Sequence, residues 1–190
     1  MAAARESFLD QFNDVPIKDI VVLDESYATT QFTRLRGRSP RGQRLPGRVP
    51  QGHWKLLTIL AAINVEGIVT AATIDATTDG DVFRTFIDEA LVPRLRRGQI
   101  VVMDNLAAHK VAGVSESIER AGCRLVYLPP YSPDLSPIEP MWSKLKQGLR
   151  SRAARTIDLL NQAVGDALTT ITPGDCAGFF RGCGYTLGSV

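Results

Sequence analysis

The chain has 190 residues, 44% of them hydrophobic, and a formal net charge of +2. This length is enough to bury one hydrophobic core, so residues 1–190 are expected to form a single α/β domain. No apolar run is long enough to span a bilayer, and the first residues lack the apolar segment of a secretory signal. These features predict a cytoplasmic protein without a membrane partner. The cysteines, Cys123, Cys176 and Cys183, lack the close spacing of a zinc site or disulfide framework and are expected to be free thiols.

The first half of the chain predicts three strands and a helix. Residues 19–24 (DIVVLD) form an apolar run that indicates a buried strand with Asp24 at its end. Residues 56–64 and 68–75 flank a short turn and indicate a hairpin, although a helix over LLTILAA remains an alternative on periodicity alone. From Asp79 the apolar spacing predicts a helix that ends in basic residues and Gly98.

The second half alternates strands and helices. Residues 99–104 (QIVVMD) repeat the pattern of an apolar strand ending in an acid, and a helix stopped by Gly122 follows. RLVYL is the fifth strand. The four prolines of PPYSPDLSP exclude a strand and predict a stiff loop leading to a helix at about 138–150, with a last amphipathic helix over 157–171. This order predicts a mixed five-stranded sheet covered by helices.

Positive charge is concentrated in two stretches without acids. The first lies between Glu25 and Glu66 and contains Arg34, Arg36, Arg38, Arg41, Arg44, Arg48 and Lys55. The second lies between Glu139 and Asp158 and contains Lys144, Lys146, Arg150, Arg152 and Arg155. Both favour contact with a polyanion, whereas the alternative for the arginine-rich stretch is a solvated, disordered loop.

Two of the predicted strands end in an acid, in VVLDES at Asp24 and in VVMDN at Asp104. Neighbouring strands lie about 4.8 Å apart, so adjacent parallel strands would bring these carboxylates together. Like charges at that distance raise each other's pKa unless a cation binds between them. Oxygen ligands without nearby His or Cys favour Mg²⁺ over Zn²⁺.

Glu139 is the candidate third acid and follows Asp104 with 34 residues between them. The structural alternative is a capping box, in which Ser136 is the N-cap, Pro137 the first helical residue and the Glu139 carboxylate serves only a backbone N–H. Asp134 is the rival third ligand, but an Asp before Leu-Ser-Pro also suits an Asx-type turn.

Three motifs, VVLDES, VVMDNLAAHK and LPPYSPDLSPIEPMWSKLK, occur here in the order in which the DDE transposases of the Tc/mariner superfamily carry them. The chain resembles the bacterial insertion-sequence branch of that family over roughly residues 20–150, and GDCAGFFRGCGY is similar to the family's C-terminal segment. The resemblance implies an RNase H-like fold and a metal-binding catalytic triad of Asp24, Asp104 and Glu139, with two Mg²⁺ or Mn²⁺ ions. It also implies double-stranded DNA partners, namely transposon ends and a TA-containing target, and a homodimer assembled on that DNA.

Other residues near these motifs have predicted roles. Asn105 supports Asp104 or the metal, with a turn as the alternative, and the resemblance places His109 near the site rather than in catalysis. Lys144 and Lys146 are candidate DNA contacts together with the six arginines between Arg34 and Arg48. Trp142 belongs to an apolar helix stripe and is expected in the core.

Family members usually carry an N-terminal helix-turn-helix region, and this chain begins only about twenty residues before Asp24. We expect that region to be absent here, because it lies on a separate chain, is fused by a frameshift, or is lost from a truncated copy. An active transposase domain of the bacterial cytoplasm, associated with the nucleoid when bound to DNA, is the leading interpretation. The alternatives are an inactive DNA-binding remnant that modulates transposition and a receiver-like, phosphate-accepting α/β domain.

Overall fold

The computed structural model describes residues 2–105 and 111–186. Its five strands form one sheet: β1 (Ile20–Thr29), β2 (Leu56–Asn64), β3 (Gly67–Ile74), β4 (Ile100–Met103) and β5 (Arg124–Tyr127). Their order in the sheet is β3-β2-β1-β4-β5, with β1–β2 and β2–β3 antiparallel and β1–β4 and β4–β5 parallel. The mixed five-stranded sheet is confirmed. Its antiparallel half contradicts the receiver-like alternative, whose sheet is parallel.

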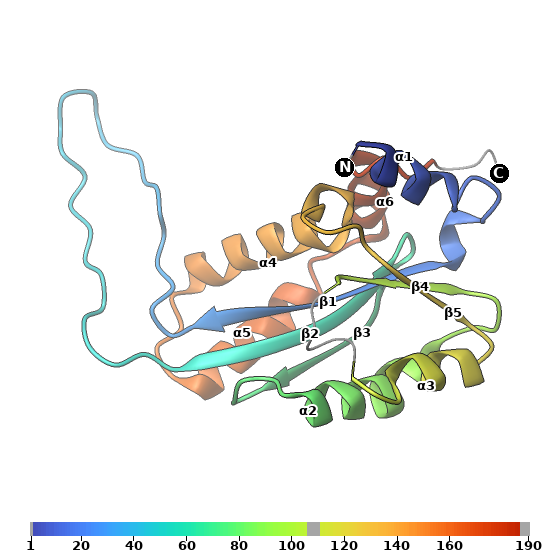
Figure 1. Cartoon of the computed structure of the whole chain (residues 1–190). Helices are drawn as coiled ribbons and strands as arrows, with labels where there is room; N and C mark the ends of the chain where they lie inside the picture. The colour runs from blue at the N-terminus through green and yellow to red at the C-terminus, as the bar shows by residue number, and fades with distance from the viewer. Residues whose placement is uncertain (1, 106–110, 187–190) are drawn as a thin grey trace.

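Helices cover both faces of the sheet (Figure 1). One face carries α1 (Ala2–Asp10), α4 (Ile138–Arg152), α5 (Ile157–Leu168) and α6 (Pro173–Gly182), and the other carries α2 (Gly80–Thr85) and α3 (Val114–Arg120). Side chains alternate between the faces along β1, so Val22 packs with α4 and α5 whereas Val21 and Leu23 pack with α2 and α3. The sheet therefore separates two hydrophobic cores.

The strand β2 settles the ambiguity over LLTILAA. Its residues from Leu57 to Asn64 are all buried, because helices cover this strand on both faces. A strand buried on both faces has no polar alternation, which is why its sequence resembled a helix. The hairpin prediction is confirmed and the helix alternative is wrong.

Two predicted boundaries were wrong. The first strand was expected to end at Asp24, but β1 continues to Thr29 because β2 offers a pairing partner along that whole length. The helix that begins at Asp79, whose carboxylate accepts from the N–H of Val82, continues as π and 3-10 turns and ends at Arg94 instead of reaching Gly98. Pro93 lies in that last turn and lacks an N–H, which favours the early end.

Two helices lie outside the predicted set. α1 covers the N-terminal segment, and α6 forms where the C-terminal tail had no predicted structure. α6 begins with a capping box, in which the hydroxyl of Thr172 accepts from the N–H of Asp175 and the carboxylate of Asp175 accepts from the N–H of Thr172. The two helices lie beside each other (Figure 1), and the segments that follow them pack through the rings of Phe12 and Tyr185, whose centroids are 5.5 Å apart.

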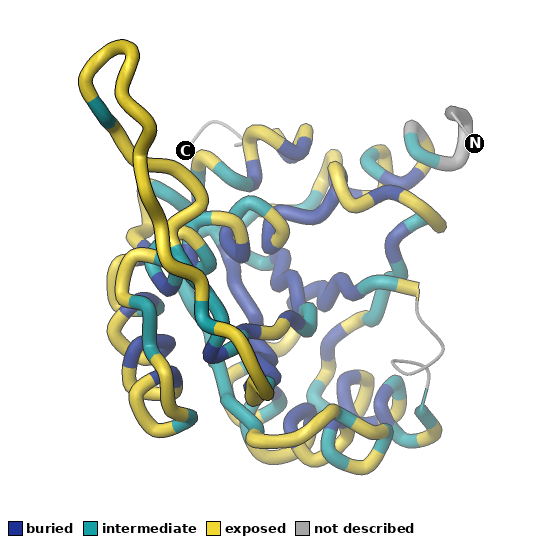
Figure 2. Tube along the Cα trace, turned by 90° about the vertical axis from the view of Figure 1, so that its left-hand side faces the viewer, coloured by how far each residue is buried: buried dark blue, intermediate teal, exposed yellow. Residues whose placement is uncertain are grey.

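The connection from β1 to β2, residues 30–55, projects far from the body of the molecule and is mostly exposed (Figures 1 and 2). We call it the basic loop, because it holds the six arginines from Arg34 to Arg48. The guanidinium of Arg155 donates to the carbonyls of Thr30 and Phe32, both at 2.9 Å. The base of the loop is therefore tied to the segment between α4 and α5.

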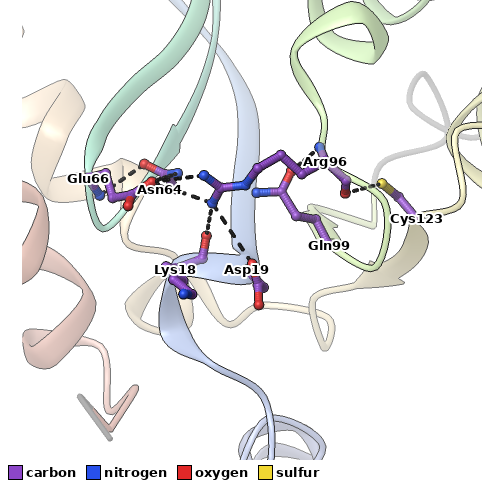
Figure 3. Close-up of polar contacts among 7 residues, drawn as sticks. All are labelled: Lys18, Asp19, Asn64, Glu66, Arg96, Gln99 and Cys123. Atoms are coloured by element: carbon purple, nitrogen blue, oxygen red, sulfur yellow. Dashed lines mark hydrogen bonds and ion pairs between the residues drawn. The ribbon is translucent and has the colours of Figure 1, made fainter. Parts of the chain in front are cut away.

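At the opposite end of the sheet from the two strand acids, Arg96 joins several elements (Figure 3). Its guanidinium donates to the carbonyl of Lys18 at 3.1 Å and to the carboxylate of Glu66 at 3.4 Å, and it lies 3.9 Å from Asp19. The thiol of Cys123 donates to the carbonyl of Arg96 at 3.2 Å. These contacts connect the start of β1, the β2–β3 turn and the segment before β4.

The remaining expectations about the chain concern thiols and membranes. Cys123, Cys176 and Cys183 are all buried and free, as predicted. Across residues 2–105 and 111–186, we find no helix with the length and apolar character needed to cross a bilayer.

Candidate active site

The parallel pairing of β1 and β4 brings Asp24 and Asp104 side by side. Val22 pairs with Val102, and each Asp lies two residues beyond its valine. Because side chains alternate along a strand, both carboxylates project from the face that α4 covers. The condition attached to the sequence prediction, that the two strands are adjacent and parallel, is met.

Glu139 reaches the same region from α4. The indole N–H of Trp142 donates to Oδ2 of Asp24 at 3.0 Å, which places this helix face over β1. Glu139 lies three residues before Trp142, and residues at this spacing share a helix face. The first turn of α4 thus presents Glu139 toward the strand that carries Asp24.

The capping-box alternative for Glu139 is wrong. The N-cap position of α4 is Pro137, no side chain caps the helix, and the N–H of Glu139 donates to the carbonyl of Ser136 at 3.1 Å. Proline at this position shifts the start of the helix by one residue and offers no hydroxyl. The carboxylate of Glu139 is therefore not used in capping, and it has no hydrogen bond or ion pair with any residue that the structure describes.

The three acids line one cavity of about 370 Å³. Its other lining residues come from β1, the end of β4 and the proline loop: Leu23, Asn105, Leu128, Pro129, Pro130, Tyr131, Ser132, Pro133 and Ser136. Asn105 lines the cavity next to Asp104, and its predicted support of that acid stays a prediction, whereas His109 lies outside the described residues. The structure gathers one acid from each of three segments that are far apart in sequence.

Burial makes the cavity electrostatically unusual. The pKa of Asp24 is raised to about 7, mainly by burial and also by the charges of Asp104 and Glu139, although hydrogen bonds from the backbone of Glu25 and from Trp142 act to lower it. Without a cation, the Asp24 carboxyl group is therefore still partly protonated at neutral pH. A divalent ion would remove this penalty by supplying positive charge between the acids.

The donor set fits a hard divalent ion. All three groups are carboxylates, and Mg²⁺ takes oxygen ligands, usually one or two carboxylates together with waters and phosphate oxygens. Within the described ranges no group of three His, Cys, Asp or Glu side chains is placed so that it could already hold a metal ion. The three acids therefore line one cavity without forming a preassembled metal site, and an ion shared by them would have to draw their side chains together.

The family assignment follows from the sequence match to a family model. The model described as "DDE superfamily endonuclease" matches residues 19–161, a span that contains all three acids. The chain belongs to this endonuclease superfamily. Its family is one of endonucleases. A search of curated proteins finds no match.

Solved structures similar to this DDE endonuclease include complexes of the Mos1 transposase. The "paired-end complex with left transposon end" has a TM-score of 0.77 and 14% identity, covering 95% of this chain and 57% of that chain. The "mariner paired end complex with Mn" has a TM-score of 0.78 and 13% identity, again covering 95% of this chain and 57% of that chain. The Mos1 catalytic domain with Raltegravir and Mn has a TM-score of 0.69 and 13% identity, and the match covers 95% of this chain and 86% of that chain. These matches confirm the RNase H-like fold, and the DDE endonuclease spans less than two thirds of the Mos1 chains in the DNA complexes.

The rival acid Asp134 lies outside the cavity of this DDE endonuclease. Its exposed carboxylate forms an ion pair with Arg5 of α1, which lowers the pKa of Asp134. The hydroxyl of Tyr185 donates to the carbonyl of Leu135 at 3.1 Å. Contacts with both ends of the chain therefore hold the proline loop in place, and they give Asp134 a structural role.

The two candidate lysines of α4 lie in different environments. Lys144 is paired with Asp175 of α6 and so faces away from the acids. Lys146 lies 5.1 Å from the ring centroid of Tyr27, and its pKa is lowered by burial although the charges of Glu139 and Asp24 act to raise it. Of the two, only Lys146 is close enough to the cavity for its charge to interact with the acids.

The six arginines of the basic loop are all exposed. None of them forms an ion pair or a hydrogen bond with another described residue. Four of them, Arg34, Arg36, Arg38 and Arg48, line a groove together with Arg150 and Arg155. Positive charge that no acid compensates within the fold is available to an external anion.

Two features of the site were missed in the sequence. Trp142 was expected only in the core, yet its N–H contacts a site acid, and its spacing of three residues from Glu139 was the available signal. Tyr131 lines the cavity, is 93% exposed and has a φ of 56°. The motif PPYSP marked a stiff turn, but not that a tyrosine would adopt a left-handed conformation there.

Proposed function

We propose that this chain is the catalytic domain of a DNA transposase that cuts and joins DNA with divalent metal ions. Asp24, Asp104 and Glu139 would be the metal ligands. One observation carries the proposal: acids from β1, β4 and α4 line a single cavity in which burial raises the pKa of Asp24 to about 7. A buried acid cluster of this kind is stabilised by a bound cation.

The proposed role of each side chain follows from the element that carries it. Asp24 and Asp104 reach the cavity from the sheet and Glu139 reaches it from α4, and a scissile phosphate would bind among them. Two bound divalent ions would activate water and later a DNA 3′-OH and would neutralise charge on the phosphate. In-line phosphoryl transfer needs positioning and charge rather than a nucleophilic side chain. Asn105, also at the cavity, would support Asp104 by hydrogen bonding, and His109 would lie nearby.

The positive groups would hold the DNA backbone. Lys146 is the best-placed residue for a phosphate next to the acids, whereas Lys144 would first have to leave its ion pair with Asp175. The basic loop arginines Arg34, Arg36, Arg38, Arg41, Arg44 and Arg48 would bind phosphates farther along the duplex. Such contacts are independent of sequence and sensitive to salt.

The chain would act within a larger assembly. Mos1 structures with transposon ends support double-stranded DNA as the partner. We further propose a bacterial insertion-sequence element moved by cut-and-paste into TA targets, with a homodimer on DNA. The working place would be the bacterial cytoplasm, at the nucleoid when DNA is bound.

The test is a nicking assay on DNA with terminal repeats, using Mg²⁺ or Mn²⁺ and the recognition region supplied in trans. We expect the wild-type chain to cleave this DNA and EDTA to abolish the cleavage. The variant Asp104→Asn should not cleave, whereas the exposed control Asp14→Asn should cleave like wild type. DNA binding by the wild-type chain without cleavage, even with Mn²⁺, would overturn the proposal and indicate an inactive DNA-binding remnant.

A further inference from the structure

We propose that Trp142 is a positioning residue of the metal site, whose indole N–H fixes the carboxylate of Asp24 and so sets the affinity for a divalent ion. The inference rests on the proposed function, in which Asp24 is a metal ligand. It assigns a second role to a side chain that otherwise belongs to the hydrophobic core.

The contact is well defined. Trp142 is 2% exposed and is the largest fully buried side chain among the described residues. Its ring packs in the core on the α4 face of the sheet, where Met141 and Leu145 are also buried. Its only polar atom donates to Oδ2 of Asp24 at 3.0 Å. Packing therefore immobilises the donor, and the donor in turn restrains the acid.

This restraint matters because a carboxylate rotates easily. The torsion that turns an Asp carboxyl group has a broad, two-fold profile, so packing alone does not fix it. The indole N–H binds Oδ2 and the backbone N–H of Glu25 also donates to this carboxylate, so the orientation of the Asp24 carboxylate is restrained. An ordered ligand oxygen binds an ion more tightly, because less conformational freedom is lost on binding.

The chemistry of the donor suits a metal site. An indole N–H is neutral, donates one hydrogen bond and accepts none. A lysine or arginine at this place would neutralise Asp24 and compete with a cation for the carboxylate. Tryptophan orients the acid and leaves its negative charge in place.

The position of Trp142 in α4 links the two sides of the cavity. Glu139 and Trp142 lie three residues apart, so one helix provides a proposed ligand and also the group that orients another ligand on β1. A buried indole N–H needs a hydrogen-bond partner, and a backbone carbonyl would satisfy it equally well. In this chain the acceptor of the indole N–H is instead Asp24, an acid of the cavity, and this choice of partner points to a functional role for Trp142.

The first test measures Mn²⁺ affinity by calorimetry for the wild-type chain and for Trp142→Phe. We expect the substitution to weaken binding by about tenfold to a hundredfold, as is typical when a group that orients a metal ligand is removed. The matched control is Leu149→Ala, since Leu149 is a buried residue of the same helix farther from the acids. This control removes core packing but should leave the affinity within about twofold of wild type, because it leaves the Asp24 contact in place.

The second test separates the hydrogen bond from the shape of the ring. The chain has two tryptophans, so Trp54→Phe leaves Trp142 alone and allows its replacement by benzothienylalanine, in which sulfur replaces the N–H. This analogue should reproduce the loss of affinity while the fold remains intact by circular dichroism. In the Trp54→Phe protein, the fluorescence of Trp142 should also change saturably with Mn²⁺, and Asp104→Ala should abolish that change.

The outcomes are distinguishable. If wild type binds Mn²⁺ and both Trp142 replacements bind it equally well, the inference is wrong and Trp142 is a core residue only. An equal loss of affinity in Leu149→Ala would also refute it, because the effect would then come from general destabilisation. If wild type binds no Mn²⁺ at all, the proposed metal site itself fails and the inference fails with it.

Discussion

Replacing Asp24 with asparagine should stabilise the metal-free protein at neutral and alkaline pH. The carboxyl group has a pKa of about 7 in the folded chain, against 3.8 when unperturbed, because it is buried next to other acids. Well below pH 3.8 it is protonated in both the folded and the unfolded states and carries no penalty. As the pH rises toward 7, only the unfolded state ionises freely, so folding becomes less favourable.

The size of the effect follows from the shift. The pKa of Asp24 differs by roughly three units between the folded and the unfolded chain. At about 1.36 kcal/mol per unit, this lowers the free energy of unfolding of the metal-free wild type by about 4 kcal/mol above pH 7. The amide introduced by Asp24→Asn would keep an oxygen to accept from Trp142 and would never ionise. The substitution should therefore recover up to this amount at pH 8 and almost none at pH 4.

The assay is urea unfolding of both proteins in EDTA at pH 4 and pH 8, with Asp14→Asn as an exposed control that should show no pH-dependent gain. Divalent metal should then stabilise wild type and not the variant. The argument that burial penalises this carboxylate would be refuted if Asp24→Asn and wild type had the same free energy of unfolding at pH 8. It would also be refuted if the variant were less stable than wild type by the same amount at both pH values.

Three further predictions concern other parts of the molecule. Tyr131→Asn should raise the free energy of unfolding by about 1 kcal/mol in urea titrations, because Tyr131 has a φ of 56° and Asn tolerates this region better; a loss of stability would contradict this. Replacing Arg36, Arg38 and Arg41 with Gln should reduce the slope of log affinity for DNA against log salt by about 2 to 3 if each contacts one phosphate, and an unchanged slope would exclude the basic loop from the interface. Burial raises the pKa of the Cys176 thiol to about 11, so it should resist alkylation at pH 8 until the chain is unfolded, as mass spectrometry can measure.

The parts of the site that could be predicted were the local ones. Apolar runs ending in acids identified the strands of Asp24 and Asp104, and the proline loop located the start of α4 near Glu139. The α6 capping box was also available locally, in the Thr-Pro-Gly-Asp sequence from Thr172, and was overlooked.

The missed features depend on partners that are distant in sequence. The continuation of β1 beyond Asp24 requires β2, which follows only after the long basic loop. The second role of Trp142 depends on an acid 118 residues away. Periodicity identifies Trp142 as buried but contains no information about which polar atom its N–H will meet. The start of α4 depends on how consecutive prolines direct the backbone, and this shifted the N-cap by one residue.

The two halves of β1 differ in their lateral support. From Ile20 to Val22 the strand is paired with β4, but beyond Val22 it is paired only with β2. Asp24 lies just past this change, and the outer half leads directly into the basic loop. Beyond the pair of Tyr27 and Thr58 only β1 and β2 continue, and such a two-stranded ribbon twists and bends more readily than the interior of a sheet. Strain applied to the loop by a long, stiff ligand would therefore be absorbed in the ribbon before it reached the carboxylates.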